Sequence, residues 1–446
     1  MWLAQWLGHQ ARAIPAAYLA AIAAGTALLM LPAATNSRQP PALIDAAFTA
    51  TSALCITGLT TVDTRTFWSP FGQVVIMTLI QIGGFGIVTV ASFLTLIATG
   101  RVSLQGSLLA SQELHQRNLS DTLRLPARIG LVMLGAEAVT AAVLTLAFRR
   151  STDDWGTAVW YGVFHAISAF NNAGFALFSD NLIGFVGDPF IILPICAAII
   201  LGGVGFPVLF ELSRRWRTRR ASYWSAHARM TIYGSLILLV VGFLAFAVFE
   251  WNNPRTLGPL PFGGKLLASL AGTVFPRTAG FNSIDYGVAS ESTLGLSYVL
   301  MFIGGGSAGT AGGVKVGTVG IIIATVLAEL RGEDQVVVAH RGIPKSVQRS
   351  AMAIVLLGGL AVGLATLFLV ADHRFTFQQA LFETISAFGT VGLTTGITPK
   401  LSPPALVVLM ALMYVGRVGT ISVATALAVR ARHRRYLLPE EQPIVG

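Results

Sequence analysis

The sequence predicts an all-α membrane protein built from four helix–pore loop–helix repeats around one pseudo-fourfold pore. Three observations lead to this prediction: an apolar composition, apolar stretches long enough to cross a bilayer, and a glycine motif that recurs along the chain. The 446 residues are 54% hydrophobic and only 11% charged, whereas soluble domains are about 25% charged. A soluble fold of this length would need more charge to cover its surface.

Several apolar stretches reach about 20 residues, the length that crosses a hydrocarbon core. Clear cases are 13–32, 191–210, 230–249 and 351–370. The first of them also resembles a cleavable signal, because a basic residue precedes it and small residues end it. Its length is greater than that of a usual signal core and favours a first spanning helix.

A short motif with a glycine before Leu or Phe recurs four times, and such repetition is the signature of an internally repeated architecture. The glycines are Gly58, Gly174, Gly280 and Gly392, separated by 116, 106 and 112 residues. An apolar segment of about 12 residues precedes each glycine, too short to span a bilayer and suited to a re-entrant helix. A longer apolar stretch with a second glycine cluster follows each one.

Each repeat is therefore predicted to be an outer helix, a half-length pore helix, an extended loop and an inner helix. This gives eight spanning helices and four re-entrant pore helices. The predicted repeats are 13–100, 126–213, 229–330 and 347–430, followed by a C-terminal tail at 431–446. A generic bundle with glycines at helix contacts is the alternative, but it does not explain four short helices that are each followed by a polar loop.

The basic residues predict the orientation in the membrane. Of the 30 Lys and Arg residues, 19 lie on the side that holds both termini, 8 lie on the other side, and the remaining three lie in pore-region segments. An excess of basic residues marks the cytoplasmic side, so both termini are expected in the cytoplasm. The basic run at 214–220 is then a topology anchor near the lipid bilayer, and no nucleic-acid partner is expected.

The repeated loops predict a filter for a monovalent cation. Rings of backbone carbonyls replace the water of a dehydrated cation in potassium channels, and glycine lets successive carbonyls point inward. The C-terminus of each pore helix adds partial negative charge. Side chains vary between the loops while the glycine stays, as expected of a site made of main chain. The predicted filter residues are Ile56, Thr57, Gly58, Asn172, Ala173, Gly174, Thr278, Ala279, Gly280, Thr390, Val391 and Gly392.

These loops and the inner-helix glycine clusters resemble the superfamily of potassium transporters that includes the Trk, Ktr and plant HKT proteins. The resemblance covers nearly the whole chain, and the start of the first repeat near Met1 favours the Ktr type. It implies one filter glycine per repeat, potassium as substrate, sodium as a candidate activator and no organic cofactor. In plant relatives a serine at the first position accompanies sodium transport, so Gly58 favours potassium.

The same resemblance implies partners that the residues themselves do not show. They are a homodimeric membrane part in the cell (plasma) membrane and a separate cytosolic, nucleotide-binding RCK-type subunit. The predicted role of this chain is that of the ion-translocating subunit of a potassium uptake system.

The third inner helix is predicted to be broken at 304–313. Segment 304–315 has five glycines in its first nine residues, and each glycine costs about 1 kcal/mol relative to alanine in a helix. Non-helical backbone at membrane depth is tolerated where it lines a cavity, and the resemblance implies an intramembrane gating loop here. A flexible linker and a phosphate-binding loop are alternatives, although no strand precedes the segment. The predicted gating residues are Gly304, Gly305, Gly306, Gly309, Gly312, Gly313, Lys315 and Arg417.

Arg417 stands where the other repeats have Gly84, Gly203 and Gly305. A charge inside a spanning helix is expensive and usually faces a cavity, and the resemblance implies that this arginine projects under the pore. A buried ion pair that only braces helices is the alternative.

Four other charged residues fall in predicted membrane segments. Lys315 either faces the gate or snorkels to the cytoplasmic interface. Arg277 is expected to turn away from the pore and bind neighbouring loops. Glu383 is placed to brace the filter from behind, and Glu137 has no partner that the sequence identifies.

A sodium-coupled secondary carrier and a less selective monovalent cation transporter are the alternative functions. Carriers usually have two inverted halves with helices broken in corresponding places, whereas this sequence predicts four parallel copies and only one strongly broken inner helix. An enzyme is not expected. The cysteines Cys55 and Cys196 form no disulfide framework or metal site, and no metal-ligand spacing links the histidines His9, His115, His165, His227, His340, His373 and His433.

Overall fold

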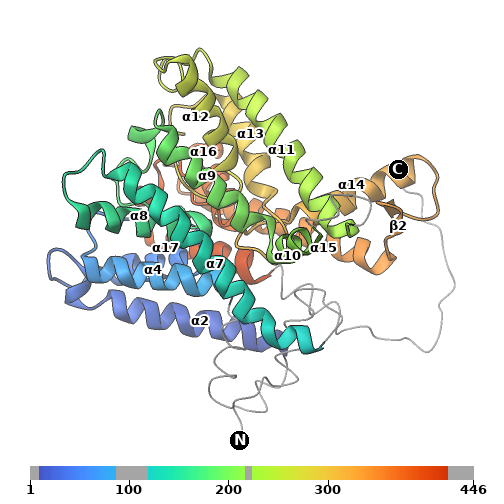
Figure 1. Cartoon of the computed structure of the whole chain (residues 1–446), viewed down its shortest axis with the longest axis horizontal. Coiled ribbons are helices and arrows are strands. Elements are labelled where there is room, and N and C mark those ends of the chain that lie inside the picture. Colours follow the sequence, from blue (N-terminus) through green and yellow to red (C-terminus); the bar gives the residue numbers. More distant parts are fainter. Residues whose placement is uncertain (1–9, 87–118, 216–223, 420–446) are drawn as a thin grey trace, which may run out of the picture.

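A computed structural model describes residues 10–86, 119–215 and 224–419 of the chain (Figure 1). The mostly helical class that the sequence predicts is confirmed, and the described strands form one small hairpin, β1 (Val337–Val338) antiparallel to β2 (Arg341–Gly342). Four parts of the predictions lie outside the described residues: the end of the first repeat at 87–100, residues 216–220 of the basic run, the end of the fourth repeat at 420–430 and the tail at 431–446.

The first half of the chain begins with α2 (Gln10–Leu29), which packs against both α3 (Leu43–Leu54) and α4 (Pro70–Phe85). The helices α7 (Leu119–Phe148), α8 (Trp155–Phe170) and α9 (Pro189–Val204) follow and pack on one another. The helix α10 (Phe206–Arg215) comes directly after α9. Short 3-10 turns, η1 (Pro32–Ala34) and η2 (Ile183–Phe185), lie in the connections.

In the second half a longer helix is again followed by a short one, twice. This half contains α11 (Ala226–Glu250), α12 (Phe262–Val274), α13 (Glu291–Phe302) and α14 (Val316–Leu330). It continues with α15 (Lys345–Val370), α16 (Phe377–Gly389), the 3-10 turn η4 (Thr398–Lys400) and α17 (Pro403–Tyr414). A π-helical turn, η5 (Val415–Gly419), extends α17.

Proline and glycine set several of the helix ends. The inner helices α4, α9 and α17 begin with proline in the first turn, after Ser69, Asp188 and Ser402. Proline suits this position because its missing N–H would have no partner in the first turn anyway. α4 and α9 end at Gly86 and Gly205, where φ is 75° and 97°, values that glycine adopts without steric cost.

One expected span is bent. The apolar stretch 191–210 has the length of one membrane-crossing helix, but α9 and α10 meet at an angle of 94° around Gly205. Only glycine fits at this bend, because the carbonyl of Ser307 lies where a side chain on Gly205 would be. The prediction of only one strongly broken inner helix is therefore wrong, because the second inner helix is broken as well.

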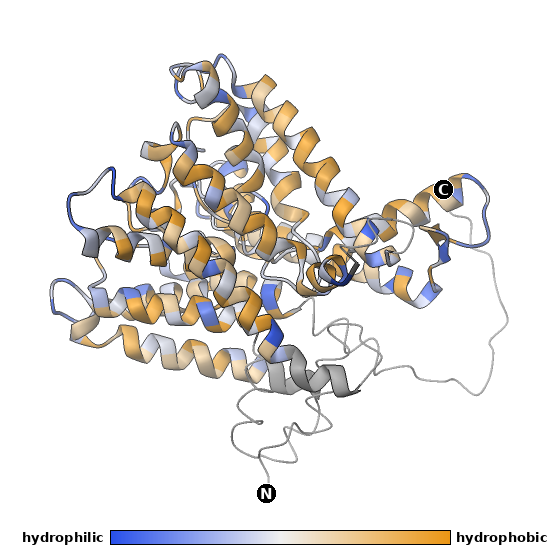
Figure 2. Ribbon diagram, in the orientation of Figure 1, coloured by the Kyte–Doolittle hydropathy of each residue, from blue (hydrophilic) through white to orange (hydrophobic). Residues whose placement is uncertain are grey.

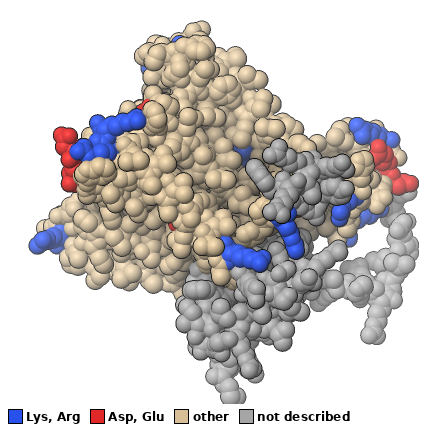
Figure 3. Space-filling model, viewed as in Figure 1, with Lys and Arg blue, Asp and Glu red and all other residues tan. Residues whose placement is uncertain are grey.

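The apolar surface agrees with a membrane protein. Among the described helices, α7 (from Pro126), α11 and α15 are long and apolar enough to cross a membrane, and α9 with α10 passes the same test as one bent span. Helices α2, α3, α4, α14 and α17 are apolar but shorter, so the count of eight spans stays a prediction. Apolar residues dominate along the helices (Figure 2), and many of their large apolar side chains are exposed. A broad uncharged area separates the charged margins of the face in Figure 3.

The four short helices α3, α8, α12 and α16 form the inner part of the molecule. Their C-terminal halves are buried almost completely; in α16, for example, every residue from Phe382 to Gly389 is buried. Each short helix packs against the longer helix that precedes it. This arrangement brings the loops after the short helices together at the centre.

Candidate functional site

The loops after the four short helices share an unusual backbone conformation. Two residues before each loop glycine, φ is positive at a residue that is not glycine: 51° at Ile56, 57° at Asn172, 67° at Thr278 and 48° at Thr390. The glycines Gly58, Gly174, Gly280 and Gly392 also have positive φ, from 71° to 101°. Such values are uncommon outside glycine and mark a backbone held by its surroundings.

These four glycines lie against one another through their main chains. A Cβ atom on Gly58 would lie 2.3 Å from the carbonyl oxygen of Ala173, and one on Gly174 would lie 2.7 Å from Cα of Gly280. A Cβ on Gly280 would lie 2.2 Å from the oxygen of Val391, and one on Gly392 would lie 2.1 Å from that of Thr57. The structure thus brings the predicted filter segments together in a closed ring, where a side chain cannot fit.

Local hydrogen bonds hold each loop to the end of its own helix. The main-chain N–H groups of Thr57, Ala173 and Val391 each donate to the carbonyl of a serine five residues earlier, with an N···O distance of 2.8 Å in each case. Two of these serines also accept from the glycine N–H through their hydroxyls: Ser52 from Gly58 at 3.0 Å and Ser386 from Gly392 at 3.1 Å. The third loop has Val274 at this position, and there the N–H of Ala279 donates to the carbonyl of Phe275 instead.

The second glycine clusters allow the inner helices to approach the short helices closely. A Cβ on Gly83 would lie 2.0 Å from the oxygen of Leu54, one on Gly202 would lie 1.9 Å from that of Phe170, and one on Gly416 would lie 1.8 Å from that of Phe388. Each of these carbonyls belongs to the last residues of a short helix. The clusters therefore serve a backbone contact that every other residue type would block.

The segment 303–315 is not helical. α13 ends at Phe302 and α14 begins at Val316, and the ends of the segment are joined by a bridge between Ile303 and Val314. Its middle packs into the bend between α9 and α10: Gly306 N donates to Gly203 O at 2.8 Å, and Phe206 N donates to Ala308 O at 3.1 Å. The interruptions of two inner helices therefore interlock, which the sequence did not indicate.

Three buried or half-buried cations donate hydrogen bonds to carbonyls of this segment. Arg417 Nη1 donates to Thr310 O at 2.7 Å, while its Nη2 donates to Gly83 O at 2.9 Å. Lys315 Nζ turns back to the carbonyls of Ala311, at 2.6 Å, and Gly312, at 3.1 Å, rather than extending away from its segment. Arg277 Nη2 donates to Gly304 O at 3.4 Å.

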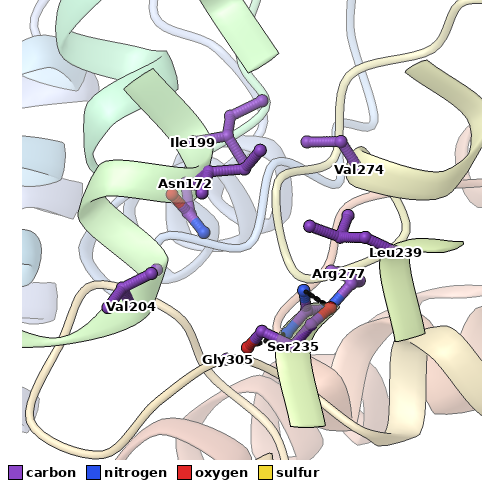
Figure 4. Close-up of a pocket in the computed structure, with 10 residues that line it drawn as sticks. Asn172, Ile199, Val204, Ser235, Leu239, Val274, Arg277 and Gly305 are labelled. Carbon is purple, nitrogen blue, oxygen red and sulfur yellow. Dashed lines mark hydrogen bonds between the residues drawn. The ribbon is translucent and has the colours of Figure 1, made fainter. Parts of the chain in front are cut away.

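Arg277 turns away from the loop ring, as expected. Its Nη2 donates to the Ser235 hydroxyl of α11 at 3.0 Å (Figure 4). Arg277 and Ser235 border a small, mainly apolar cavity between α9 and α11, whose lining includes Asn172, Ile199, Leu239 and Gly305. The prediction that Arg277 binds neighbouring loops is correct for Gly304 but incomplete, because its closer partner is on a helix.

Two buried carboxylates have polar partners that the sequence did not identify. Glu137 of α7 accepts from Gln81 Nε2 at 2.8 Å and from Asn171 Nδ2 at 2.9 Å, so it joins α4 to the end of α8. Glu383 of α16 accepts from the hydroxyls of Thr394 and Thr398 and, at 3.1 Å, from Thr395 N. The only signal in the sequence was an acidic residue in an apolar segment.

One short helix begins with an acidic cap in the polar loop before it. Asp154 is the N-cap of α8 and accepts from the side-chain hydroxyl and the backbone N–H of Thr157, both at 2.7 Å. These hydrogen bonds lower the pKa of the Asp154 carboxyl below its ordinary value. Among the described residues, no group of three or more His, Cys, Asp or Glu side chains could hold a metal ion.

Comparisons with known proteins agree with this picture. A family model for TrkH, described as a cation transport protein, matches residues 4–436. The chain is 40% identical to the Ktr system potassium uptake protein B of Bacillus subtilis, over 91% of this chain and 89% of that protein. It is 36% identical to the protein of the same name from Vibrio alginolyticus, over 98% and 95% of the two chains.

A third relative carries a broader name. The chain is 35% identical to the potassium/sodium uptake protein NtpJ of Enterococcus hirae, over 97% of this chain and 96% of that protein. Among solved structures, the crystal structure of the potassium transporter TrkH from Vibrio parahaemolyticus has the same fold, with a TM-score of 0.73 at 18% identity, and the match covers 95% of this chain and 85% of that one. The chain is thus a membrane protein that belongs to the TrkH family of cation transport proteins, which are transporters and not enzymes.

Proposed function

We propose that this chain takes up potassium across the cell membrane, as the ion-translocating subunit of a Ktr-type system. The observation that supports this most is the ring formed by Gly58, Gly174, Gly280 and Gly392, whose main chains meet at one point. Carbonyl oxygens of four loops are then available at one place, and such oxygens are the ligands that replace the water of a potassium ion. Two relatives are named potassium uptake proteins of this system.

In this proposal the filter consists of residues 56–58, 172–174, 278–280 and 390–392. The C-termini of α3, α8, α12 and α16 approach the filter and add their partial negative charge. The pore is channel-like, and the chain crosses the membrane eight times with both termini in the cytoplasm. Potassium is the substrate, and no organic cofactor is required.

The gate in this proposal is the segment 304–313 together with Lys315 and Arg417. A guanidinium stays charged at any physiological pH, so Arg417 presents a fixed positive charge beside this segment. The hydrogen bonds from Arg417 to Thr310 and Gly83 hold the segment closed across the ion path. We further propose that the chain functions as a homodimer and that a cytosolic nucleotide-binding RCK-type subunit, similar to KtrA, releases the gate.

A sodium-coupled carrier or a less selective monovalent cation transporter is the second candidate. Two observations favour it. The relative from Enterococcus hirae is named a potassium/sodium uptake protein, and two inner helices are broken here, at Gly205 and at 303–315. Broken helices in matching places are a feature of secondary carriers.

Flux measurements on purified protein in liposomes distinguish these candidates. Uptake of potassium, rubidium and sodium is followed with and without an imposed sodium gradient, and protein-free liposomes give the background. The proposal expects potassium and rubidium flux well above sodium flux, driven by their own gradients. Potassium uptake against its gradient, in a fixed ratio to sodium entry, would establish the carrier instead. Equal potassium and sodium flux would establish the less selective transporter.

A further inference from the structure

One position in the four short helices has the same relation to each loop glycine. It lies nine residues before the glycine and is occupied by Thr49, His165, Ala271 and Glu383. All four residues lie within a short helix, behind the ring of glycines, and all four are buried. Of the four, His165 and Glu383 have side chains long enough to reach the loop with an acceptor atom, an imidazole nitrogen or a carboxylate oxygen.

Both side chains accept from the main-chain N–H of the residue that lies three positions after their loop glycine. The N–H of Leu177, three residues after Gly174, donates to His165 Nε2 at 3.3 Å. The N–H of Thr395, three residues after Gly392, donates to Glu383 Oε1 at 3.1 Å. Two residues of different chemistry thus make one equivalent contact in two repeats.

The remaining contacts fix each of these side chains in place. His165 Nδ1 lies 2.7 Å from Tyr161 O, so this nitrogen donates while Nε2 accepts, and the ring is a neutral tautomer. The ring also stacks on Phe178, with centroids 5.0 Å apart. Glu383 is held by the hydroxyl of Thr398 at 2.8 Å. Side chains locked in this way can position the groups that they bind.

The other two repeats lack this contact. The Thr49 hydroxyl has no hydrogen-bond partner. In the third repeat the side chain of Ala271 has no polar atom, and the hydroxyl of Ser283, three residues after Gly280, is also unpartnered. Gly174 and Gly392 occupy opposite corners of the glycine ring, because Gly58 and Gly280 lie between them on the two sides. The contact from this helix position to the loop N–H is therefore made on one diagonal only. The first loop is held differently, because the hydroxyl of Thr61, three residues after Gly58, donates to Asp45 of α3 at 2.7 Å.

We infer that His165 and Glu383 are positioning residues that set the selectivity of the filter, by holding the loops of the second and fourth repeats from behind. The inference rests on the proposed function. A carbonyl ring that keeps its size favours potassium over a smaller ion, and the two braces oppose contraction of the ring. The brace acts on the main chain beyond the glycine and touches no ion itself.

The test compares potassium, rubidium and sodium flux of variants in the same liposomes as the parent. Glu383→Ala and His165→Ala should each lower the ratio of potassium to sodium flux several-fold, and Glu383→Gln should recover much of it, because Gln Oε1 can still accept from Thr395. Thr49→Val is the matched control: it changes the equivalent position of the first repeat, whose hydroxyl binds nothing, and should leave the ratio unchanged.

The outcomes separate the inference from the function. Selective potassium flux in the parent, with the same ratio in both alanine variants, would show that the braces are only structural. A parent without potassium flux would instead overturn the proposed function. If Glu383→Ala does not reach the membrane, Thr398→Val replaces it, since it removes one donor from the Glu383 carboxylate. A smaller drop in the ratio then supports the inference, and an unchanged ratio contradicts it.

Discussion

Arg417 Nη1 donates a hydrogen bond to the carbonyl oxygen of Thr310 at 2.7 Å, and thereby joins the π-helical turn after α17 to the non-helical segment 303–315. The other end of the guanidinium holds Gly83 O of α4 at 2.9 Å. One side chain therefore ties the first, third and fourth inner helices together. A planar guanidinium can do this because its donors point in fixed, divergent directions, whereas an ammonium is a point charge.

Replacing Arg417 should increase transport. Arg417→Ala removes both the positive charge and the two hydrogen bonds that hold the segment, so the maximal potassium flux in liposomes should rise several-fold. The ratio of potassium to sodium flux should change little, since the four loop glycines are untouched.

Arg417→Lys separates the two effects of the arginine. If the charge alone impedes the ion, the lysine variant should conduct like the parent. If the link between Thr310 and Gly83 matters, the lysine variant should conduct faster than the parent, because one ammonium does not reproduce the two-pronged contact. Failure of both variants to assemble, seen by size-exclusion chromatography, would make Arg417 a structural brace and contradict the gate.

Deleting Gly305–Gly312 tests the segment directly. The deletion removes the carbonyl of Thr310 and the contacts with the bend after α9, so flux should rise and depend less on the proposed cytosolic subunit. The measurement is potassium uptake with and without that subunit and its nucleotide. A deleted protein that inserts normally and conducts no faster than the parent would show that the segment is structural.

Gly205→Ala should disturb the same segment from the other side. Gly205 has a φ of 97°, and an added Cβ would lie 2.4 Å from Ser307 O. With ψ at 138°, this conformation is open to glycine almost alone and costs alanine about 1–3 kcal/mol, and the overlap must push residues 305–310 away. We expect a lower thermal unfolding midpoint and a flux that differs from that of the parent.

Gly332→Ala is the control for this change. Gly332 also has a positive φ, 66°, but an added Cβ would meet nothing within 4 Å. It carries the strain of a positive φ without the overlap, so it should lower stability slightly and leave flux unchanged. Equal flux in Gly205→Ala and the parent would mean that the bend after α9 plays no part in gating.

The sequence predicted the elements that depend on local pattern and missed those that depend on contacts between repeats. The break at 304–313 follows from glycine content alone, and the structure has no helix from 303 to 315. The bend at Gly205 does not follow, because one glycine in an apolar stretch resembles those at ordinary helix contacts. The requirement for glycine there comes from the carbonyl of Ser307, about one hundred residues away in sequence, which leaves no room for a side chain.

The same limit applies to the polar partners in the interior. The sequence indicated that Glu137 and Glu383 were unusual, because an acidic residue in an apolar segment needs a compensating contact. The partners of Glu137 lie 56 residues before it and 34 residues after it, on α4 and α8. Such a contact depends on how helices pack, and helix periodicity carries no information about that.

Glu137→Gln should destabilise the protein. The carboxylate accepts from both Gln81 and Asn171, whereas a glutamine can accept at only one end and turns an amide donor toward the other. Leaving a buried donor unpaired costs about 1–3 kcal/mol, so the thermal unfolding midpoint in detergent should fall by about 1–3 °C for a chain of this length. The double exchange Gln81→Glu with Glu137→Gln restores complementary donors and acceptors, and should recover much of that loss. A midpoint that does not change in the single variant would show that the contact contributes little.

Gly58→Ser should reduce the preference for potassium over sodium. Gly58 has a φ of 91°, and an added Cβ would lie 2.3 Å from Ala173 O and 3.1 Å from Gly174 Cα. The first and second loops must therefore move apart, which shifts the carbonyls of Thr57 and Ala173. Since ions are selected by the position and number of such carbonyls, the ratio of potassium to sodium uptake should fall several-fold in cells that lack other potassium transporters.

Gly396→Ser is the matched control, because Gly396 has a similar φ of 85° with nothing within 4 Å of an added Cβ. If Gly396→Ser lowers the ratio as much as Gly58→Ser, backbone strain explains the effect, and if neither variant lowers it, these loops do not form the filter.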